Sequence, residues 1–324
     1  MPQRNTNRVR NPRSYQMFLG VDGGGTKTNI AIMNDARDIV AEAVGGPANP
    51  LRVGVETAVA NIVKAVDAAR DAGGVSRGDI VAATLGLAGV RRADIRNRVR
   101  ERFVELYRVR KTSITTDADI ALYCTTLGKP GVAVIAGTGS VCLGINAKGE
   151  KVMAGGWGPL AGDEGGGRGI AEQALHRIAK ASDGRGPATK LSERAAVYFR
   201  ASNVENLIGA IYSPNMDNSR IAGFAKEVVE TALEGDKIAI QIIEDAGREL
   251  GTAVVAVIRK LKLQKSSFPI GCVGSVFKAG TLLTEPMNEI ILTVAPKARL
   301  AEPQMPPSHA AALLAMMNGG KITT

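Results

Sequence analysis

The sequence predicts an α/β protein of two lobes around a central cleft. Predicted strands alternate with predicted helices in both halves of the chain, which is the pattern of α/β folds. One unit of three strands, with a glycine-rich turn after the first strand and Gly-Gly after the third, occurs twice, at 18–46 and 131–156. The segment Gly-Lys-Pro-Gly at 128–131 separates the copies as a hinge. A unit repeated across a hinge predicts two lobes, and ligands usually bind between lobes.

In the first half, the three-strand unit is followed by alternating helices and strands. The loop PANPLRVG leads into an amphipathic helix at 55–72, because apolar residues such as Val55, Val59 and Ile62 recur at helical spacing. Gly73-Gly74 ends that helix. The elements predicted next are a buried strand in 80–90, a basic helix near 92–107, a strand near 112–116 and a helix over 118–128.

In the second half, the repeated unit is followed mainly by helices. A glycine-rich loop runs into a helix that starts near Gly169, and residues 185–260 are rich in helical periodicity. A strand at 270–273, a further helix, and a strand within 294–308 complete the half. The chain ends in a short apolar helix near 308–320.

The length of 324 residues predicts about two domains. We place a disordered basic tail at 1–16, a first domain at 17–129 and a larger second domain at 130–307, and we expect the helix near 308–320 to pack on the first domain. The longest apolar runs are shorter than the ~18 residues that cross a bilayer. With no apolar segment in the basic N-terminus, we expect a cytoplasmic protein with no membrane partner.

Charge and composition argue against several kinds of partner and active site. The net charge of +10 comes from the tail and from the stretch 91–111. Aromatic residues make up 4% of the chain, too few for base-stacking surfaces, so the basic stretch is predicted to be a solvated helix face and no nucleic-acid partner is expected. Three scattered cysteines and two histidines argue against a disulfide framework and against Cys or His metal sites. Acid–base chemistry therefore falls to carboxylates.

The two glycine-rich turns, DGGGTKT (22–28) and AGTGS (136–140), are candidate phosphate loops. Neither matches the Walker A or the Rossmann pattern. Each offers unobstructed backbone amides, which bind phosphate oxygens, and the hydroxyls of Thr26, Thr28, Thr138 and Ser140. Asp22 beside the first turn is a candidate Mg²⁺ ligand. Two such turns facing one another would hold a polyphosphate from both sides.

Two further segments allow a functional and a structural interpretation. Asp117 ends a predicted strand beside the hinge, where a carboxylate could take a proton from a hydroxyl, or it could cap the helix that follows. In the loop GWGPLAGDEGGG, Asp163 could accept hydrogen bonds from a ligand, or it could favour a helix N-terminus. We expect Trp157 in the same loop to be a core residue rather than a stacking platform.

Five motifs in order, DGGGTKT, TTDAD, AGTGS, GGWGPLAGDEGG and CVGSVFKAG, resemble the N-acetylglucosamine kinase branch of the BadF/BadG/BcrA/BcrD ATPase family, within the actin/hexokinase/Hsp70 superfamily. The resemblance covers about residues 17–315. It implies an actin-like ATPase fold of duplicated ribonuclease H-like domains, with ATP and Mg²⁺ as cofactors, and a homodimer.

The resemblance also implies roles for matching residues. Asp22 would lie near Mg²⁺, and Asp117 matches the catalytic aspartate. The residues that would bind ATP are Gly23, Gly24, Gly25, Thr26, Lys27 and Thr28 in the first loop, Gly137, Thr138 and Gly139 in the second, and Gly274 and Ser275 beside the adenosine. The residues that would bind the sugar, besides Asp117, are Asn49, Gly156, Trp157 and Asp163.

The function implied is transfer of phosphate from ATP to the 6-hydroxyl of an amino sugar, foremost N-acetyl-D-glucosamine. Glucosamine and N-acetylmuramic acid remain alternative substrates. A second hypothesis is an ATPase that activates an acyl-CoA dehydratase or reductase, but Cys124 and Cys142 do not follow the cluster-binding pattern of such activators. A third is a sugar sensor that binds DNA through its basic stretch, although the tail is too short for a helix-turn-helix module.

Overall fold

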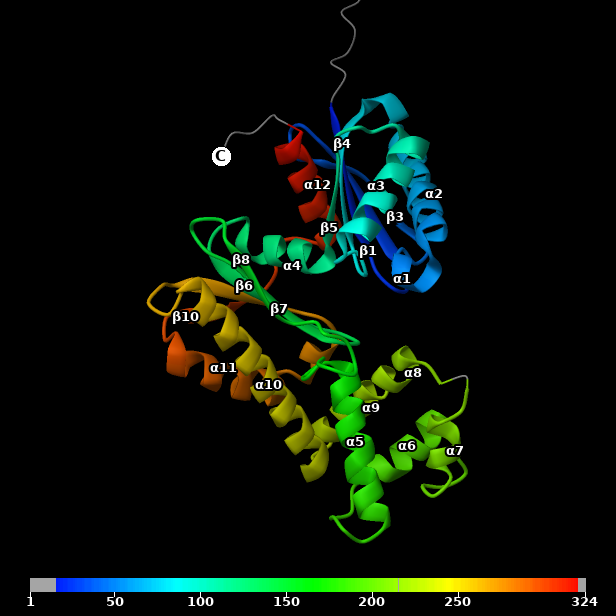
Figure 1. Ribbon diagram of the computed structural model, residues 1–324, viewed down its shortest axis with the longest axis vertical. Coiled ribbons are helices and arrows are strands. Elements are labelled where there is room, and N and C mark those ends of the chain that lie inside the picture. The colour runs from blue at the N-terminus through cyan, green and yellow to red at the C-terminus, as the bar shows by residue number, and fades with distance from the viewer. Residues whose placement is uncertain (1–15, 215, 320–324) are drawn as a thin grey trace, which may run out of the picture. The chain divides into compact units, whose positions relative to one another are not determined.

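The computed structural model describes residues 16–214 and 216–319, which form two compact units (Figure 1). The described part of the first unit spans 16–120 and 305–319, and the second unit spans 121–304. The units divide inside helix α4 (Asp117–Thr126), whereas the sequence placed the boundary after residue 129. The cause is local packing: Ile120 lies against Gly86 of the first unit, while Thr125 lies against Gly271 of the second. Apart from Gln16, the predicted disordered tail lies outside the described residues.

The first unit is built on a five-stranded sheet. Its strands are β1 (Met17–Gly23), β2 (Thr28–Asn34), β3 (Ile39–Gly45), β4 (Ile80–Leu87) and β5 (Thr112–Thr116). They lie in the order β3-β2-β1-β4-β5, with β1, β2 and β3 antiparallel and with β4 parallel to both β1 and β5. Because β1, β4 and β5 run in parallel, their carboxyl ends share one edge of the sheet.

Helices cover both faces of this sheet (Figure 1). On one face lie α2 (Val55–Gly73) and α3 (Ala93–Tyr107), whose buried Ile62, Val66 and Phe103 join the core with Leu19 and Val21. On the other face, α12 (Pro307–Asn318) packs against β1 and β4. The approach of α12 is close: a Cβ on Gly20 of β1 would overlap the Ser308 carbonyl. Short helices α1 (Pro50–Val53) and η1 (Arg77–Asp79) complete the unit.

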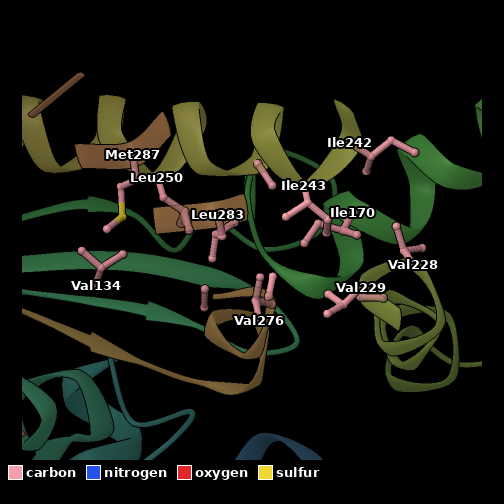
Figure 2. Packing of buried hydrophobic residues seen from close by; sticks show 14 of the residues in the cluster. Val134, Ile170, Val228, Val229, Ile242, Ile243, Leu250, Val276, Leu283 and Met287 are labelled. Atoms are coloured by element: carbon pink, nitrogen blue, oxygen red, sulfur yellow. The ribbon is translucent and has the colours of Figure 1, made fainter. Parts of the chain in front are cut away.

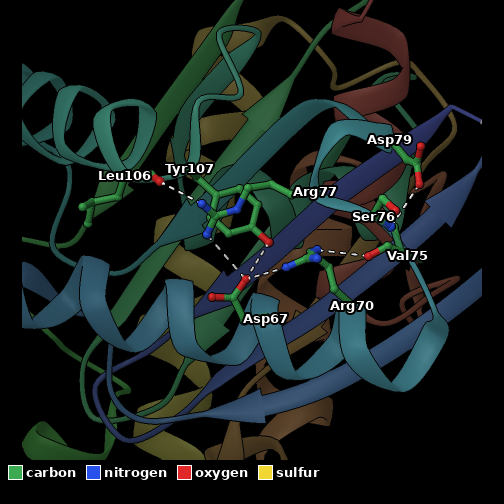
Figure 3. A network of polar contacts seen from close by, with 8 residues as sticks. All are labelled: Asp67, Arg70, Val75, Ser76, Arg77, Asp79, Leu106 and Tyr107. Atoms are coloured by element: carbon green, nitrogen blue, oxygen red, sulfur yellow. Dashed lines mark hydrogen bonds and ion pairs between the residues drawn. The ribbon is translucent and has the colours of Figure 1, made fainter.

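A polar network joins the C-terminal ends of α2 and α3 (Figure 3). Oδ1 of Asp67 accepts hydrogen bonds from Arg70 Nη1 at 2.8 Å and from the Tyr107 hydroxyl at 3.2 Å. The guanidinium of Arg77 stacks on the Tyr107 ring, 4.3 Å from its centroid. These contacts fix the angle of the two helices on the sheet.

The basic stretch 91–111 is partly structural rather than only a solvated face. Arg96 donates to the carbonyls of residues 90 and 91, and Arg100 donates to the Thr112 carbonyl at 2.9 Å. Arg102 pairs with Glu56 and Glu105. Several of the positive charges therefore bind backbone carbonyls or carboxylates at the ends of α3.

The second unit repeats the topology of the first. Its strands are β6 (Gly131–Ala136), β7 (Ser140–Ile145), β8 (Lys151–Gly155), β9 (Phe268–Val273) and β10 (Ala298–Ala301), in the order β10-β9-β6-β7-β8. Again the first three strands are antiparallel and the last two are parallel to the first. The duplication predicted from the glycine-rich turns thus extends to the complete five-stranded sheet.

Helices make up most of the rest of this unit. They are α5 (Gly167–Ser182), α6 (Leu191–Phe199), α7 (Leu207–Ile211), α8 (Asn218–Gly223), α9 (Ala225–Leu233), α10 (Lys237–Leu261), η2 (Ser275–Ala279) and α11 (Thr281–Val294). Figure 2 shows Leu250 and Leu283 between the helices and Val134 of the sheet. Gly251 lets α11 lie directly on α10, since a Cβ there would be 2.8 Å from the Met287 carbonyl oxygen. Among the described residues, none of the helices combines the length and the apolarity needed to cross a membrane.

Candidate active site

Asp22 and Asp117 lie at the same edge of the first sheet, because β1 and β5 are parallel strands that both end there. Asp22 precedes the last residue of β1, and its Oδ2 accepts a hydrogen bond from Asn29 Nδ2 at 3.0 Å. Burial raises the pKa of Asp22, while Asn29 and the charge of Lys27 act in the opposite direction. A carboxylate whose charge is poorly solvated gains from a nearby cation.

Asp117 follows β5 directly and begins α4. The cap of this helix comes from other residues: Thr116 Oγ1 accepts the Asp119 amide at 3.1 Å and donates to Asp119 Oδ2 at 2.7 Å. The Asp117 carboxylate accepts the Ala118 amide at 2.9 Å. Burial raises the pKa of Asp117 and the charge of Asp22 raises it further, although the residue stays accessible to solvent. Such a carboxylate is suited to accept a proton.

The first glycine-rich turn is held by the loops beside it. The Gly24 amide donates to the Lys27 carbonyl at 2.9 Å, and the Ala48 amide donates to the Gly24 carbonyl at 3.0 Å. Asn49 is the next residue after Ala48, which is hydrogen-bonded to the turn. Its Oδ1 caps α1 by accepting the Leu51 amide at 3.0 Å, and its side chain fills the space that a Cβ on Gly89 would need.

Sequence reasoning missed Arg52 beside this turn. Its guanidinium Nη1 lies 2.7 Å from the position that a Cβ on Gly25 would occupy. Arg52 is exposed, at the end of α1. The loop PANPLRVG offered no motif that would have singled out this arginine.

Two of the four hydroxyls predicted to grip phosphate bind the protein instead. Thr28 Oγ1 donates to the Gly46 carbonyl at 2.7 Å, and Ser140 Oγ donates to the Glu164 carbonyl at 2.6 Å. Both residues begin the second strand of their unit and are buried. Thr26 and Thr138, at the tips of the turns, are exposed and accessible to a ligand.

The second glycine-rich turn rests on the start of α5. The Gly137 amide closes the turn on the Gly139 carbonyl at 2.9 Å. The amides of Gly167 and Arg168 donate to the carbonyls of Gly137 and Thr138, both at 2.8 Å. These two bonds explain why α5 begins at Gly167 rather than near Gly169 as predicted.

Asp163 lies against the same turn. Its carboxylate accepts the Ser140 amide at 3.3 Å, and a Cβ on Gly139 would meet its carboxyl atoms at 2.5–2.6 Å. Burial raises the pKa of Asp163. Its φ of 67° is left-handed, a conformation that non-glycine residues avoid unless the surroundings impose it.

The prediction that Trp157 is a core residue is wrong. Trp157 is 72% exposed and Leu160 is fully exposed, so the large apolar side chains of the loop 156–162 lie outside the core of the second unit. The glycines around it, Gly155, Gly156 and Gly158, all have positive φ. The loop follows a path set by backbone geometry, and its two large apolar side chains, Trp157 and Leu160, are exposed.

A cavity of about 470 Å³ opens beside the second turn. Gly137 and Thr138 lie at its wall together with Ser275 of η2. Gly274 shapes the entry to η2 with a φ of 121°, and a Cβ there would overlap the Ala136 carbonyl. The other walls come from α8, α9 and η2 and include Ser219, Ala222, Lys226, Val229, Glu230, Leu233, Val276 and Lys278. Sequence analysis did not single out the residues from α8 and α9, because those helices carry no motif.

A protein-family model matches most of the chain. The model of the BadF/BadG/BcrA/BcrD ATPase family matches residues 19–315. The chain belongs to this family. It has a mixed α/β fold of two units, each built on a five-stranded sheet, and the family resemblance stated from the five motifs is confirmed.

Curated relatives of this family member cover nearly its full length. It is 33% identical over 317 residues to the N-acetyl-D-glucosamine kinase of Dictyostelium discoideum, which covers 94% of this chain and 98% of the relative. It is 28% identical over 282 residues to the N-acetylmuramic acid/N-acetylglucosamine kinase of Clostridium acetobutylicum, with 87% and 92% covered. The crystal structure of a candidate N-acetylglucosamine kinase of Chromobacterium violaceum superimposes with a TM-score of 0.74 at 24% identity, covering 93% of this chain and 99% of that one.

Proposed function

We propose that the chain is an ATP-dependent kinase that phosphorylates the 6-hydroxyl of an amino sugar, foremost N-acetyl-D-glucosamine. The observation that carries the proposal is the cavity that adjoins the second glycine-rich turn. At one end of the cavity lies the glycine-rich turn, whose backbone amides few side chains cover, and next to it the cavity wall is apolar. A nucleoside triphosphate requires this combination of phosphate-binding amides and an apolar surface for the base. The two relatives that match along nearly their whole length act on N-acetylated amino sugars by name.

In this proposal the cavity binds the nucleoside of ATP. Ala222, Val229 and Leu233 offer an apolar surface to the base, and Gly274 and Ser275 contact the adenosine. Thr138 and Gly139 bind phosphate oxygens through their amides, and Gly137, whose amide is bonded to the Gly139 carbonyl, shapes the turn without a side chain in the way of the phosphates. Lys226 and Lys278, which also line the cavity, add positive charge near them.

The phosphates also need the first turn and a cation. Gly23, Gly24, Gly25, Thr26, Lys27 and Thr28 form the first turn, where Thr28 acts through its backbone because its hydroxyl is bonded to Gly46. Asp22 would hold Mg²⁺, which typically takes one or two protein carboxylates and keeps several waters. The residues fit that demand, because Asp22 is a partly buried carboxylate whose pKa burial raises. When bound, the ion neutralises phosphate charge.

Asp117 acts as the general base. As the sugar 6-oxygen forms its bond to the terminal phosphorus, Asp117 takes the hydroxyl proton, and the bond from that phosphorus to the oxygen of ADP breaks. The raised pKa of Asp117 makes it a better proton acceptor than an ordinary aspartate. Asn49, Gly156, Trp157 and Asp163 hold the other sugar hydroxyls, with Asp163 as an acceptor next to the phosphate-binding turn.

The cysteines argue against the alternative of a dehydratase activator. Cys124 and Cys142 are buried, and burial raises the pKa of Cys142 and raises that of Cys272 to about 12. Because Cys124 and Cys142 are buried, their thiols are shielded from a cluster at a subunit interface, and they do not fit that role. Glucosamine and N-acetylmuramic acid remain alternative substrates.

The test is ADP release, followed by a coupled enzyme assay, with ATP and a panel of hexoses and amino sugars. We expect turnover with N-acetylglucosamine to exceed that with glucosamine and N-acetylmuramic acid. Absence of turnover with every sugar would refute the kinase proposal. Assembly as a homodimer, which rests on the family resemblance, and a cytoplasmic location, which rests on the pattern of apolar residues, also stay predictions; light scattering of the purified chain tests the first.

A further inference from the structure

Ser140 connects the phosphate-binding turn to the loop proposed to bind the sugar. It follows Gly139 of the turn and is 8% exposed. Its carbonyl accepts the Gly156 amide at 3.0 Å, its amide donates to Asp163 Oδ1 at 3.3 Å, and its hydroxyl donates to the Glu164 carbonyl at 2.6 Å. One residue therefore holds both ends of the loop 156–164.

The loop is held by polar and backbone contacts rather than by large buried apolar side chains. Gly156 and Gly158 at its start and Gly165 just after its end are in left-handed backbone, and Trp157 and Leu160 are exposed. Asp163 itself has a left-handed φ, which persists only where neighbouring contacts impose it. Contacts with Ser140 and Gly139 at the end of the phosphate-binding turn help to impose it, together with the Gly166 amide, which donates to the Asp163 carbonyl at 2.9 Å.

The first unit shows that this use of the hydroxyl is not a requirement of the hairpin. Thr28 holds the equivalent position at the start of β2, and its hydroxyl binds the Gly46 carbonyl, directly after the third strand of the same hairpin unit. In the second copy, the hydroxyl reaches past that point to Glu164, 24 residues along the chain. The duplicated hairpin has redirected this bond to the sugar loop.

We propose that Ser140 is a positioning residue that couples the sugar subsite to the phosphate-binding turn. A sugar that orders Asp163 also fixes the Ser140 amide and hydroxyl, and through them the backbone of Gly137–Gly139. Nucleotide binding then becomes tighter in the presence of sugar, and by linkage sugar binding becomes tighter in the presence of nucleotide by the same factor. This inference rests on the proposed kinase function.

The experiment is calorimetric titration of the full chain with AMPPNP, with and without saturating N-acetylglucosamine. For the wild type we expect the sugar to tighten AMPPNP binding by a factor on the order of 5 to 150. In Ser140→Ala that factor falls well below the wild-type value, because the hydroxyl bond that ties Glu164 to the turn is lost. Ser140→Cys, which is nearly isosteric with a weaker donor, should give an intermediate factor and serves if the alanine variant does not fold.

The matched control is Thr112→Val in the first unit. Its hydroxyl is also buried and donates to a carbonyl, that of Val109, at 2.6 Å, so the variant loses a comparable bond but should keep the wild-type factor. An unchanged factor in both Ser140 variants would overturn the inference. So would a wild type that phosphorylates the sugar yet binds AMPPNP equally with and without it, which leaves the kinase proposal intact. A wild type without any sugar phosphorylation would refute both.

Discussion

Replacing Asp117 by Asn tests the proposed base with little change to the fold. The amide oxygen can still accept the Ala118 amide, and the helix keeps its cap because Thr116 and Asp119 supply it. What is lost is the group that takes the sugar proton. General bases contribute about 10²- to 10⁴-fold, or about 3–5 kcal/mol of transition-state stabilisation. We therefore expect kcat to fall by that factor, while the affinity for AMPPNP changes by less than about threefold.

The pH dependence gives the same variant a second measurement. Because burial and the charge of Asp22 raise the pKa of Asp117, the deprotonated base is lost as pH falls through a value above the usual 3.8 of an aspartate. Wild-type kcat/KM should fall over that acid range, and the residual activity of Asp117→Asn should lack this limb. Asp119→Asn is the matched control: it weakens the helix cap but should keep most of kcat. Turnover of Asp117→Asn within about tenfold of wild type would refute the assignment.

Three further substitutions test other parts of the account. Gly274→Ala should lower the unfolding free energy by at least about 3 kcal/mol, because φ is 121° and the new Cβ overlaps the Ala136 carbonyl; Gly149→Ala, at φ 77° with open space, should cost far less in the same urea titration. Asp236→Ala should cost about 2–3 kcal/mol, since its carboxylate accepts the Ile238, Ala239 and Lys190 amides. Burial raises the pKa of Asp236, but these hydrogen bonds outweigh burial and lower the pKa below its usual value. The stability that Asp236 contributes is therefore present at pH values above the pKa of the unfolded chain and is lost as pH falls through the lower pKa of the folded state. Equal destabilisation by Asp236→Ala at pH 7 and pH 2 would contradict this. Arg52→Gln should raise the KM for ATP or lower kcat by about tenfold, whereas unchanged kinetics would remove Arg52 from the site.

The secondary structure followed closely from local patterns. The segment 80–90 was predicted as a strand from its apolar run, and β4 covers Ile80–Leu87. The repeated glycine-rich unit predicted the duplication, which the two identical sheet topologies confirm. These features depend on periodicity and turn residues, which the sequence displays directly.

The remaining features depend on contacts between distant segments. The exposure of Trp157 could not be predicted, because aromatic residues are usually buried and the loop around it contains no other signal. The path of the Ser140 hydroxyl to Glu164 and the placement of Lys226 beside the cavity both depend on how the chain returns to these positions. Sequence motifs identified the two turns and the carboxylates, whereas tertiary packing determines which of their atoms remain accessible to a ligand.

The central claim is that this chain moves the terminal phosphate of ATP to the 6-oxygen of an amino sugar. Two-dimensional ³¹P–¹H NMR of the reaction with N-acetylglucosamine tests it most directly, because it identifies the product and the oxygen that carries the phosphate. We expect a phosphate coupled to the two protons on carbon 6, formed in equal amounts with ADP. Inorganic phosphate as the product, or a phosphate coupled to the proton on carbon 1, would contradict the account.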